Sequence, residues 1–270
     1  MPERLFVTSR LLTAAGVVHG FSVRTGGVSR PPYHSLNLGL STEDAAEAVA
    51  DNLRRLGQAA GLAGEIATAH QVHGDRIMAA GPDGLREIFA ATEPQADGAD
   101  AVLALDAGVA AGVRAADCVP LLLYAEDRGA AAAVHSGWRS SRLSIAARAV
   151  RALQHAAGAD PRRTLAAVGP CIGRCCYEVS TELASLFRDR FGAEAADDPA
   201  ANPKPHLDLR FCVEAALLQA GVPRDRIEQV EGCTSCDTTS FFSHRRDRGR
   251  TGRHLAFIEA RAPSLEQPFL

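Results

Sequence analysis

Six short apolar runs between residues 65 and 137 constrain the fold of this 270-residue chain more than any other feature. Each run is bounded by Gly, Pro or Asp. The runs are EIATAHQV, RIMAA, DAVLAL, VAAGVRAA, PLLLYAED and GAAAAVHSG. Short apolar runs between turn residues predict strands, although the alanine that fills several of them is a poor strand former.

Helices are predicted before and after these runs. The segment STEDAAEAVADNLRRLGQAAG predicts a helix with Ser41 as N-cap, Asp44 in the capping-box position and Gly61 as its stop. Further helices are expected over 141–157, 180–191 and 211–220, and further strands in TLAAVGP, RIEQVEG and HLAFIEA. The strands cluster without strict alternation with helices, which favours an α+β fold with large sheets over a doubly wound fold.

A chain of this length forms one large domain or two small ones, and a single domain over residues 1–270 is predicted. The segment 192–205, rich in Ala, Asp and Pro, is predicted to be an exposed inserted loop rather than a domain boundary. The net charge of -3 and the pI near 6.3 give no basic surface for nucleic acid or for anionic lipid. Neither partner is expected, and the oligomeric state stays open.

The N-terminal segment carries Glu3 and Arg4 and has no apolar run long enough for a signal sequence or a membrane span. A cytoplasmic location is therefore predicted. Seven cysteines are an odd number in a chain too long to need disulfide bonds, and the reducing cytosol would keep them as thiols. Their expected role is reactivity or metal binding.

Three polar groups occur where apolar runs end: His73, Cys118 and His135. Side chains at strand ends can converge on a site that rigid elements hold. Two imidazoles and a thiolate would form a three-ligand zinc site whose fourth position is left for water or substrate, as in catalytic zinc sites. Their spacings match no short zinc motif, so hydrogen-bonded structural histidines and a buried small cysteine are the alternatives.

The chain resembles the YfiH family, also described as PgeF-like or laccase-domain proteins, over nearly its full length. The matching segments, in order, are HGFSVRTGGVS, SLNLGL, NLRRL, QVHG, ADCVPLLL, HSGWR, GPCIGRCCYEV, LDL, CT and FFSHRRDRGRTGR. The resemblance implies a layered αββα sandwich with mixed sheets flanked by helices. It also implies one zinc per chain on His73, Cys118 and His135, with Gly137 and Trp138 shaping the adjacent turn and wall.

The resemblance implies a purine nucleoside phosphorylase that acts on adenosine, inosine and methylthioadenosine and also deaminates adenosine. Zinc activates water for attack on a base in other deaminases, whereas phosphorolysis needs cationic groups that hold phosphate. Phosphate candidates are Arg24, Arg139 and the pair Arg245-Arg246, with backbone amides of Gly26 and Gly27. The predicted substrate-binding set is Arg24, Asn37, Gln71, Asp117 and Arg139. Family members commonly read HAGWRG, whereas this chain adds hydroxyls at Ser136 and Ser140.

Three other functions are considered for the chain. Copper oxidation of phenols is discounted, because a multicopper centre needs many paired histidines and this chain has nine histidines with no H-x-H pair. Cys118 with His135 as base would instead make a metal-free cysteine hydrolase or amidase, acting for example on cell-wall peptide precursors. A binding protein with a purely structural zinc is the non-enzymatic alternative.

Two further sets of residues are candidate ligands. His70 precedes His73 by three positions, so strand alternation places it on the opposite face and predicts that it is not a fourth ligand. Of the six cysteines outside the first site, five are further candidate ligands: Cys171, Cys175, Cys176, Cys233 and Cys236. They include one C-x-x-C, but no second C-x-x-C accompanies it, so a second metal site is not expected.

Overall fold

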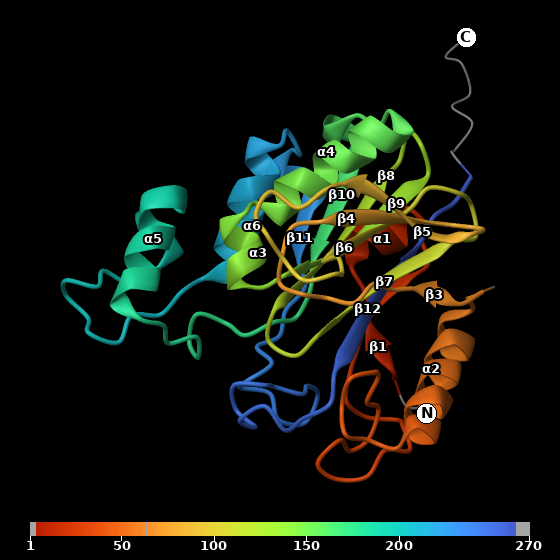
Figure 1. Cartoon of the computed structure of the whole chain (residues 1–270), viewed down its shortest axis with the longest axis horizontal. Helices are drawn as coiled ribbons and strands as arrows, with labels where there is room; N and C mark the ends of the chain where they lie inside the picture. The colour runs from red at the N-terminus through yellow and green to blue at the C-terminus, as the bar shows by residue number, and fades with distance from the viewer. Residues whose placement is uncertain (1–3, 63, 263–270) are drawn as a thin grey trace.

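The computed structural model describes residues 4–62 and 64–262, which form two mixed β-sheets with helices on both outer faces (Figure 1). The seven-stranded sheet has the order β11-β10-β8-β9-β6-β4-β5, and the five-stranded sheet has the order β1-β2-β12-β7-β3. The strands of the first sheet are β11 Ile227–Gln229, β10 Thr164–Val168, β8 Val119–Ala125, β9 Ala130–Ser136, β6 Ala101–Ala104, β4 Ile77–Gly81 and β5 Gly84–Phe89. Those of the second are β1 Phe6–Val7, β2 His19–Ser22, β12 His254–Glu259, β7 Ala110–Ala115 and β3 Ile66–Ala67.

The helices complete a layered αββα sandwich, as expected. They are α1 Arg10–Ala14, α2 Ala46–Ala60, α3 Trp138–Arg142, α4 Ile145–Ala157, α5 Thr181–Phe191 and α6 Leu209–Gln219, with short 3-10 turns η1 Pro161–Arg163, η2 Ala193–Ala195 and η3 Arg224–Arg226. The buried side chains of α4 and α6 pack in one core with the seven-stranded sheet. Leu56 of α2 packs with Leu255 and Phe257 of β12 on the far side of the five-stranded sheet. Helix α5 lies apart at the left of Figure 1.

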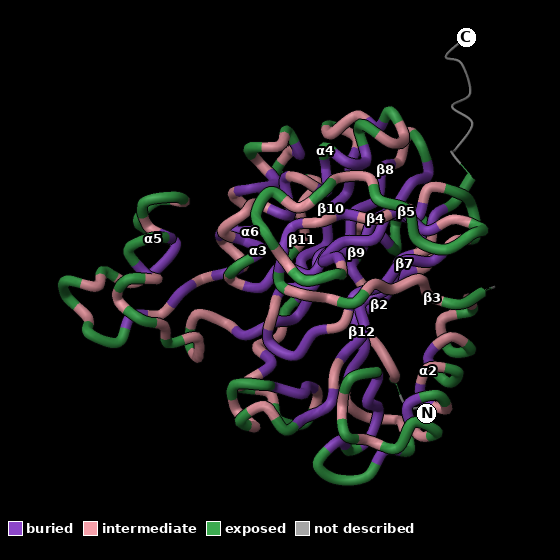
Figure 2. Tube along the Cα trace, viewed as in Figure 1, coloured by how far each residue is buried: buried purple, intermediate pink, exposed green. Residues whose placement is uncertain are grey.

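Burial on both faces explains why alanine-rich runs form strands. In β8, Leu121 and Leu123 face the helices, whereas Leu122 and Tyr124 face the other sheet. Every residue of the neighbouring strand β9 is buried, and the central strands are continuously purple in Figure 2. Packing against close neighbours on both faces favours small side chains here and overrides the weak strand propensity of alanine.

The predicted start of the helix at Ser41 is wrong. Helix α2 begins at Ala46, and its N-cap residue Ala45 makes no side-chain cap. The residues before it are held elsewhere, because the Asn37 side-chain amide donates to Thr42 Oγ1 and Asp44 Oδ2, at 2.9 Å each. The predicted stop is confirmed, since Gly61 ends the helix in the left-handed conformation at a φ of 67°.

The helix expected over 141–157 is two helices, α3 and α4, separated by Ser144 in the left-handed conformation with a φ of 55°. Helix α6 starts two residues before the predicted position, because the Asp208 side chain caps it. The segment 192–205 is irregular apart from η2, but Ala195 and Ala196 are buried, so it is not a wholly exposed loop. Elements absent from the prediction are α1, β1, β2, β5 and the 3-10 turns.

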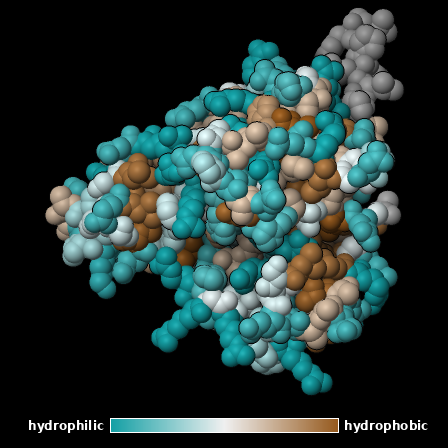
Figure 3. All heavy atoms as spheres, in the orientation of Figure 1, coloured by the Kyte–Doolittle hydropathy of each residue, from teal (hydrophilic) through white to brown (hydrophobic). Residues whose placement is uncertain are grey.

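The surface seen in Figure 3 is mostly hydrophilic, with small separate hydrophobic patches. Leu40, at 64% exposure, is the most exposed of the large apolar side chains in the described residues. Among those residues, no helix combines the length and the apolarity that crossing a bilayer requires.

Candidate metal centre

The passage of the chain from one sheet to the other brings the three candidate ligands together. His73 lies on the connection from β3 to β4, and Cys118 lies on the connection from β7 to β8. His135 belongs to β9, beside Pro120 at the start of β8. Two of these connections contain left-handed residues that are not glycine, His73 with a φ of 60° and Asp117 with a φ of 97°. Such conformations are costly for residues with a side chain, and here they occur at the site itself.

The ligand atoms of His73, Cys118 and His135 lie within 4.8 Å of one another. Cys118 Sγ is 3.9 Å from His73 Nε2, and the two imidazole rings meet edge to face with centroids 4.8 Å apart. Ligands of a tetrahedral zinc ion with ordinary bond lengths are separated by about 3.3 to 3.8 Å. The predicted convergence is confirmed, and only a small contraction would bring the three atoms onto one ion.

Asp100 supports two of the candidate ligands, His73 and His135, through hydrogen bonds. It was not predicted from the sequence. The fully buried carboxylate accepts hydrogen bonds from the backbone N–H groups of Val72, His73 and Gly74 at 3.1, 3.0 and 2.7 Å. It also pairs with His135 Nδ1 at 2.7 Å. This contact places the Nδ1 proton toward the carboxylate and leaves Nε2 free to bind a metal, an arrangement typical of metal-bound histidines. The one sequence signal was its place immediately before a buried strand.

The electrostatics of the site favour an ionised thiol. Burial acts to raise the pKa of Cys118, but attraction to His135 and hydrogen bonds from both histidines outweigh it and lower that pKa below its usual value. Burial acts to lower the pKa of His135, and Cys118 and Asp100 together raise it. A thiolate is the form that binds a metal, and it is also the form that acts as a nucleophile. The donor set therefore fits a metal ion and also fits a thiolate–imidazolium pair.

Gly137 is a position where a side chain would displace two of the candidate ligands. A Cβ atom placed there would lie 3.0 Å from Cys118 Sγ and 3.0 Å from His73 Cδ2. We expect Gly137→Ala to weaken metal binding by at least about 10-fold, as other changes beside metal ligands do. Equilibrium dialysis with zinc measures the effect. Gly57→Ala is the control, because nothing lies within 4 Å of that position inside α2; it should leave metal binding unchanged and stabilise the helix by about 0.5–1 kcal/mol.

The three candidate ligands line a cavity of about 660 Å³, within the size range of small-molecule sites. Its lining comes from both sheets and from the loops that follow β10 and β11. Besides the ligands, the chemically informative residues of the lining are His70, Gln71, Arg114, Asp117, Ile172, Tyr177, His244, Arg245 and Arg253. The sequence reading missed Arg114, Tyr177, His244 and Arg253 as cavity residues, although two of them lie in the quoted segment FFSHRRDRGRTGR.

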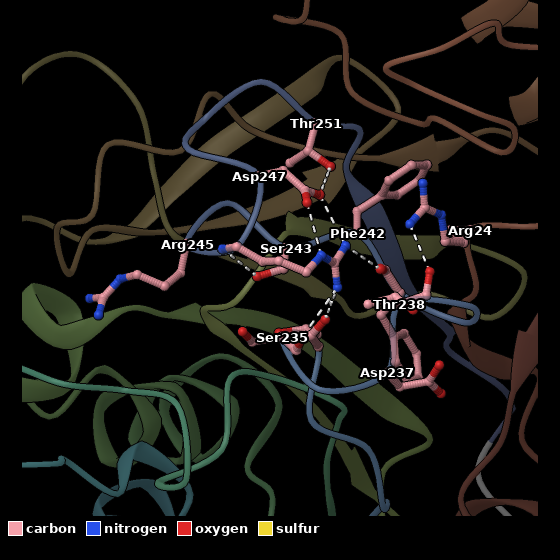
Figure 4. Close-up of polar contacts among 12 residues, drawn as sticks. Arg24, Ser235, Asp237, Thr238, Phe242, Ser243, Arg245, Asp247 and Thr251 are labelled. Carbon is pink, nitrogen blue, oxygen red and sulfur yellow. Dashed lines mark hydrogen bonds and ion pairs between the residues drawn. The ribbon is translucent and has the colours of Figure 1, made fainter.

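Of the arginines predicted to bind phosphate, Arg245 lines the main cavity, whereas Arg24 and Arg246 do not. Arg245 lines the cavity, stacks on the Tyr177 ring at 5.0 Å and donates to the Glu178 carbonyl. Arg24 does not line it; its guanidinium donates to the carbonyls of His34 and Thr238. Figure 4 shows Arg24 directed to Thr238, whereas Arg245 extends away from that network. Arg246 forms an ion pair with Asp247 and donates to the carbonyls of Thr234 and Phe241. Its guanidinium therefore stabilises the loop conformation.

Arg139 lies on α3 and lines a second, smaller hollow of about 380 Å³ that shares His73 with the main cavity. Its guanidinium stacks on the Trp138 ring at 4.8 Å. Trp138 thus forms a wall of this hollow.

The remaining predicted residues divide between the cavity and its support. Gln71 lines the cavity and exchanges two 2.7 Å hydrogen bonds with the Arg114 backbone. Asp117 also lines it, and its carboxylate accepts from Thr234 Oγ1 and from the Arg245 N–H. Asn37 is fully buried and bonds to loop residues. The Gly27 N–H donates to Ser35 Oγ, so the Gly26-Gly27 pair belongs to a packed turn.

His70 lies in the cavity wall but is not in the three-ligand group, as expected. The reason given for that expectation was wrong. Strand β3 ends at Ala67, so residues 70 and 73 do not follow the alternation of a strand. The left-handed turn at His73 decides instead which imidazole reaches Cys118.

Comparison with known proteins agrees with this architecture. The chain is 37% identical over 254 residues to the purine nucleoside phosphorylase YlmD of Geobacillus stearothermophilus, covering 92% of this chain and 91% of the relative. It is 33% identical over 251 residues to the adenosine deaminase RL5 of an unidentified prokaryote, covering 89% of this chain and 93% of that one. The crystal structure of YlmD from Geobacillus stearothermophilus superimposes with a TM-score of 0.83 at 34% identity, covering 96% of this chain and all of the other.

These similarities confirm the resemblance found in the sequence, and they extend over nearly the whole chain. The relatives at 37% and 33% identity carry the names of enzymes that act on purine nucleosides. A family model described as multi-copper polyphenol oxidoreductase laccase matches residues 18–261. The chain therefore belongs to this laccase-domain family, which includes the YfiH and YlmD proteins.

Proposed function

We propose that this protein is a zinc-dependent purine nucleoside phosphorylase that acts on adenosine, inosine and methylthioadenosine and also deaminates adenosine. One observation carries the proposal most directly: a three-ligand centre of two histidines and a cysteine opens into a cavity that also holds an arginine-rich wall. The names of the relatives supply the substrate class.

The residues present fit zinc. His73, Cys118 and His135 would hold it through two imidazole nitrogens and a thiolate, and three protein ligands are typical of zinc sites that keep a position open. A bound zinc would supply Lewis acidity in the cavity. The chain itself keeps the His135 ring in one orientation through Asp100 and holds Cys118 in place through the turn at Asp117.

The rest of the cavity offers two kinds of surface. Tyr177, Ile172 and Ala116 give an apolar and aromatic wall on which a purine ring can pack. Arg245 and Arg253 supply guanidinium groups, and in residues 4–62 and 64–262 neither forms an ion pair with a carboxylate. Such groups bind phosphate through paired N–H donors. A nucleoside and phosphate can therefore be held together beside the metal centre.

The small number of histidine ligands argues against polyphenol oxidation by several copper ions. Multicopper oxidation needs a type 1 copper with a trinuclear cluster, and nine histidines without an H-x-H pair are too few paired ligands. In the described part of the chain, the residues that could hold a metal form two groups, the three-ligand centre and a cluster of four cysteines. Neither has the histidine pairs of a trinuclear copper cluster.

A product analysis tests the proposal. Adenosine incubated with the protein and phosphate should yield adenine and ribose 1-phosphate, and without phosphate slow conversion to inosine should remain. Release of free adenine at the same rate without phosphate would contradict phosphorolysis. Absence of any reaction on adenosine, inosine and methylthioadenosine would contradict the proposed substrate class.

A second candidate function follows from the Cys118–His135 pair. The same electrostatics that favour a metal ligand also favour a thiolate nucleophile with an imidazole as its proton acceptor. A metal-free hydrolase or amidase acting on peptide precursors of the cell wall is therefore the alternative. Chelation separates the two functions, because only the zinc-dependent enzyme would lose turnover.

Arg245→Ala should raise the KM for phosphate by about 10-fold to 100-fold, which corresponds to the loss of one charged hydrogen-bond partner. Steady-state kinetics at varied phosphate concentration measures it. Deamination of adenosine without phosphate should change less than about threefold, because no anion takes part. Arg54→Ala, on the exposed face of α2, is the matched control, and Arg139→Ala tests the hollow on the other side of His73. A larger effect of Arg139→Ala than of Arg245→Ala would move the phosphate site to that hollow.

A further inference from the structure

Four cysteines from two distant segments meet on one side of the main cavity. Cys175 and Cys176 lie in the turn that follows β10, and Cys233 and Cys236 lie in the turn that follows β11. Strands β10 and β11 are parallel neighbours, so their C-terminal ends deliver both turns to the same edge of the sheet. A short bridge between Cys171 and Cys233 continues this pairing past the strands.

The four sulfur atoms are arranged as one closed group. All of them lie within 4.8 Å of one another. Cys175 Sγ is 3.7 Å from Cys233 Sγ and 3.5 Å from Cys236 Sγ, and Cys176 Sγ is 3.3 Å from Cys236 Sγ. Four thiolates around a zinc ion with Zn–S bonds of about 2.3 Å are separated by about 3.8 Å. The distances are close to those of such a tetrahedron and too long for disulfide bonds.

We infer that Cys175, Cys176, Cys233 and Cys236 form a second metal site, a structural tetrathiolate zinc centre distinct from the centre at His73, Cys118 and His135. Four protein thiolates leave no position for substrate, and closed sets of this kind are typical of structural zinc. The two centres share no residue. The protein would therefore bind two zinc ions per chain with different donor sets.

The backbone around the cluster supports thiolates. The Gly173 N–H donates to Cys233 Sγ at 3.2 Å, a contact that stabilises a charged sulfur. A Cβ atom at Gly173 would lie 3.1 Å from Cys175 Sγ and 3.4 Å from Cys233 Sγ, so the absence of a side chain lets this N–H reach the cluster. The Cys176 N–H donates to the Gly173 carbonyl, which closes the turn that points two adjacent cysteines inward.

The cluster is connected to the main cavity through the neighbours of its cysteines. Thr234, next to Cys233, donates to the carboxylate of Asp117, the residue before Cys118. Tyr177, next to Cys176, lines the cavity and stacks with Arg245. A metal that joins the two turns would fix both the Tyr177 wall and the support of Asp117. Its expected effect is on the stability and shape of the cavity rather than on chemistry.

The sequence argument against this site relied on the lack of a second C-x-x-C. That argument missed the cluster because the partner of Cys233 and Cys236 is an adjacent pair, Cys175 and Cys176. Two neighbouring cysteines face opposite sides in a strand, but here they lie in a turn. Only the pairing of β10 with β11 brings the two segments together.

Metal analysis of protein purified without a polyhistidine tag, in a reductant that does not bind metal, tests the inference. The unaltered protein should carry close to two zinc ions per chain. The double variant Cys175→Ser/Cys236→Ser should lose one of them and should unfold at a Tm several degrees lower. Ser235→Ala, in the same turn, and Cys212→Ala, a buried cysteine of α6, are matched controls that should keep both ions.

A second measurement distinguishes the two metal centres. In cobalt-substituted protein, four thiolates should give a strong thiolate-to-cobalt absorption that persists in His73→Ala and falls in the double serine variant to the weaker absorption of the single Cys118 thiolate. Retention of both zinc ions by the double variant would overturn the inference. So would iron in place of zinc, or two disulfide bonds found under the reducing conditions of the purification. If His73→Ala instead keeps two ions, the first centre fails and the inference stands.

Discussion

Cys118→Ala and His135→Ala are each expected to lower kcat/KM for adenosine phosphorolysis at least about 100-fold, a loss of about 2.7 kcal/mol or more in transition-state stabilisation. Each variant removes one of three donors whose atoms lie within 4.8 Å, so the remaining two cannot hold a metal tightly. The zinc content should fall by one ion per chain in both variants. Initial rates and metal analysis on the same preparations measure the two losses together.

Two controls separate loss of the centre from loss of folding. Cys212→Ala removes a buried thiol outside both clusters, and His155→Ala removes an imidazole on α4 that lies tilted against the Phe89 ring. Both should keep the zinc content and most of the activity. If Cys118→Ala or His135→Ala retains its full zinc content while losing activity, these residues are not metal ligands, and the proposal of a zinc centre fails.

Much of the strand content could be predicted, because buried strands bounded by turn residues leave a local signal. All six runs between residues 65 and 137 contain strands, although EIATAHQV contributes only the two residues of β3. The helix boundaries depended on tertiary contacts that the local sequence does not report. Asn37 binds Asp44, which was expected in the capping-box position of α2, and Ser144 interrupts the helix expected over 141–157.

In the candidate site, too, residues with a local sequence signal could be predicted, and residues whose role depends on tertiary contacts could not. The three candidate ligands could be identified because each stands where an apolar run ends, and the family resemblance selects the same three. Asp100 could not be identified, since its role depends on the fold placing the turn at His73 against the start of β6. Arg24 and Asn37 lie in matching segments, but their polar groups are used to hold loops. The resemblance marks such residues without saying whether they meet the cavity.

Chelation is expected to abolish nucleoside turnover and to expose Cys118 to alkylation. A thiolate bound to zinc shares its charge with the metal, so it should react slowly with iodoacetamide until the zinc is removed. Turnover should return when zinc is added to unalkylated protein. Peptide mapping must follow Cys118 by itself, because the chain has seven cysteines and four of them belong to the second cluster.

A free Cys118–His135 pair gives the opposite result. Its thiolate, already favoured by the neighbouring His135, would be alkylated quickly before any chelator is added, and turnover would not depend on the metal. The double variant Cys175→Ser/Cys236→Ser is the matched background, because any loss of turnover on chelation in that variant cannot come from the cysteine cluster. Turnover that survives chelation in this background, with Cys118 rapidly alkylated throughout, would exclude zinc catalysis and assign the site to a cysteine nucleophile.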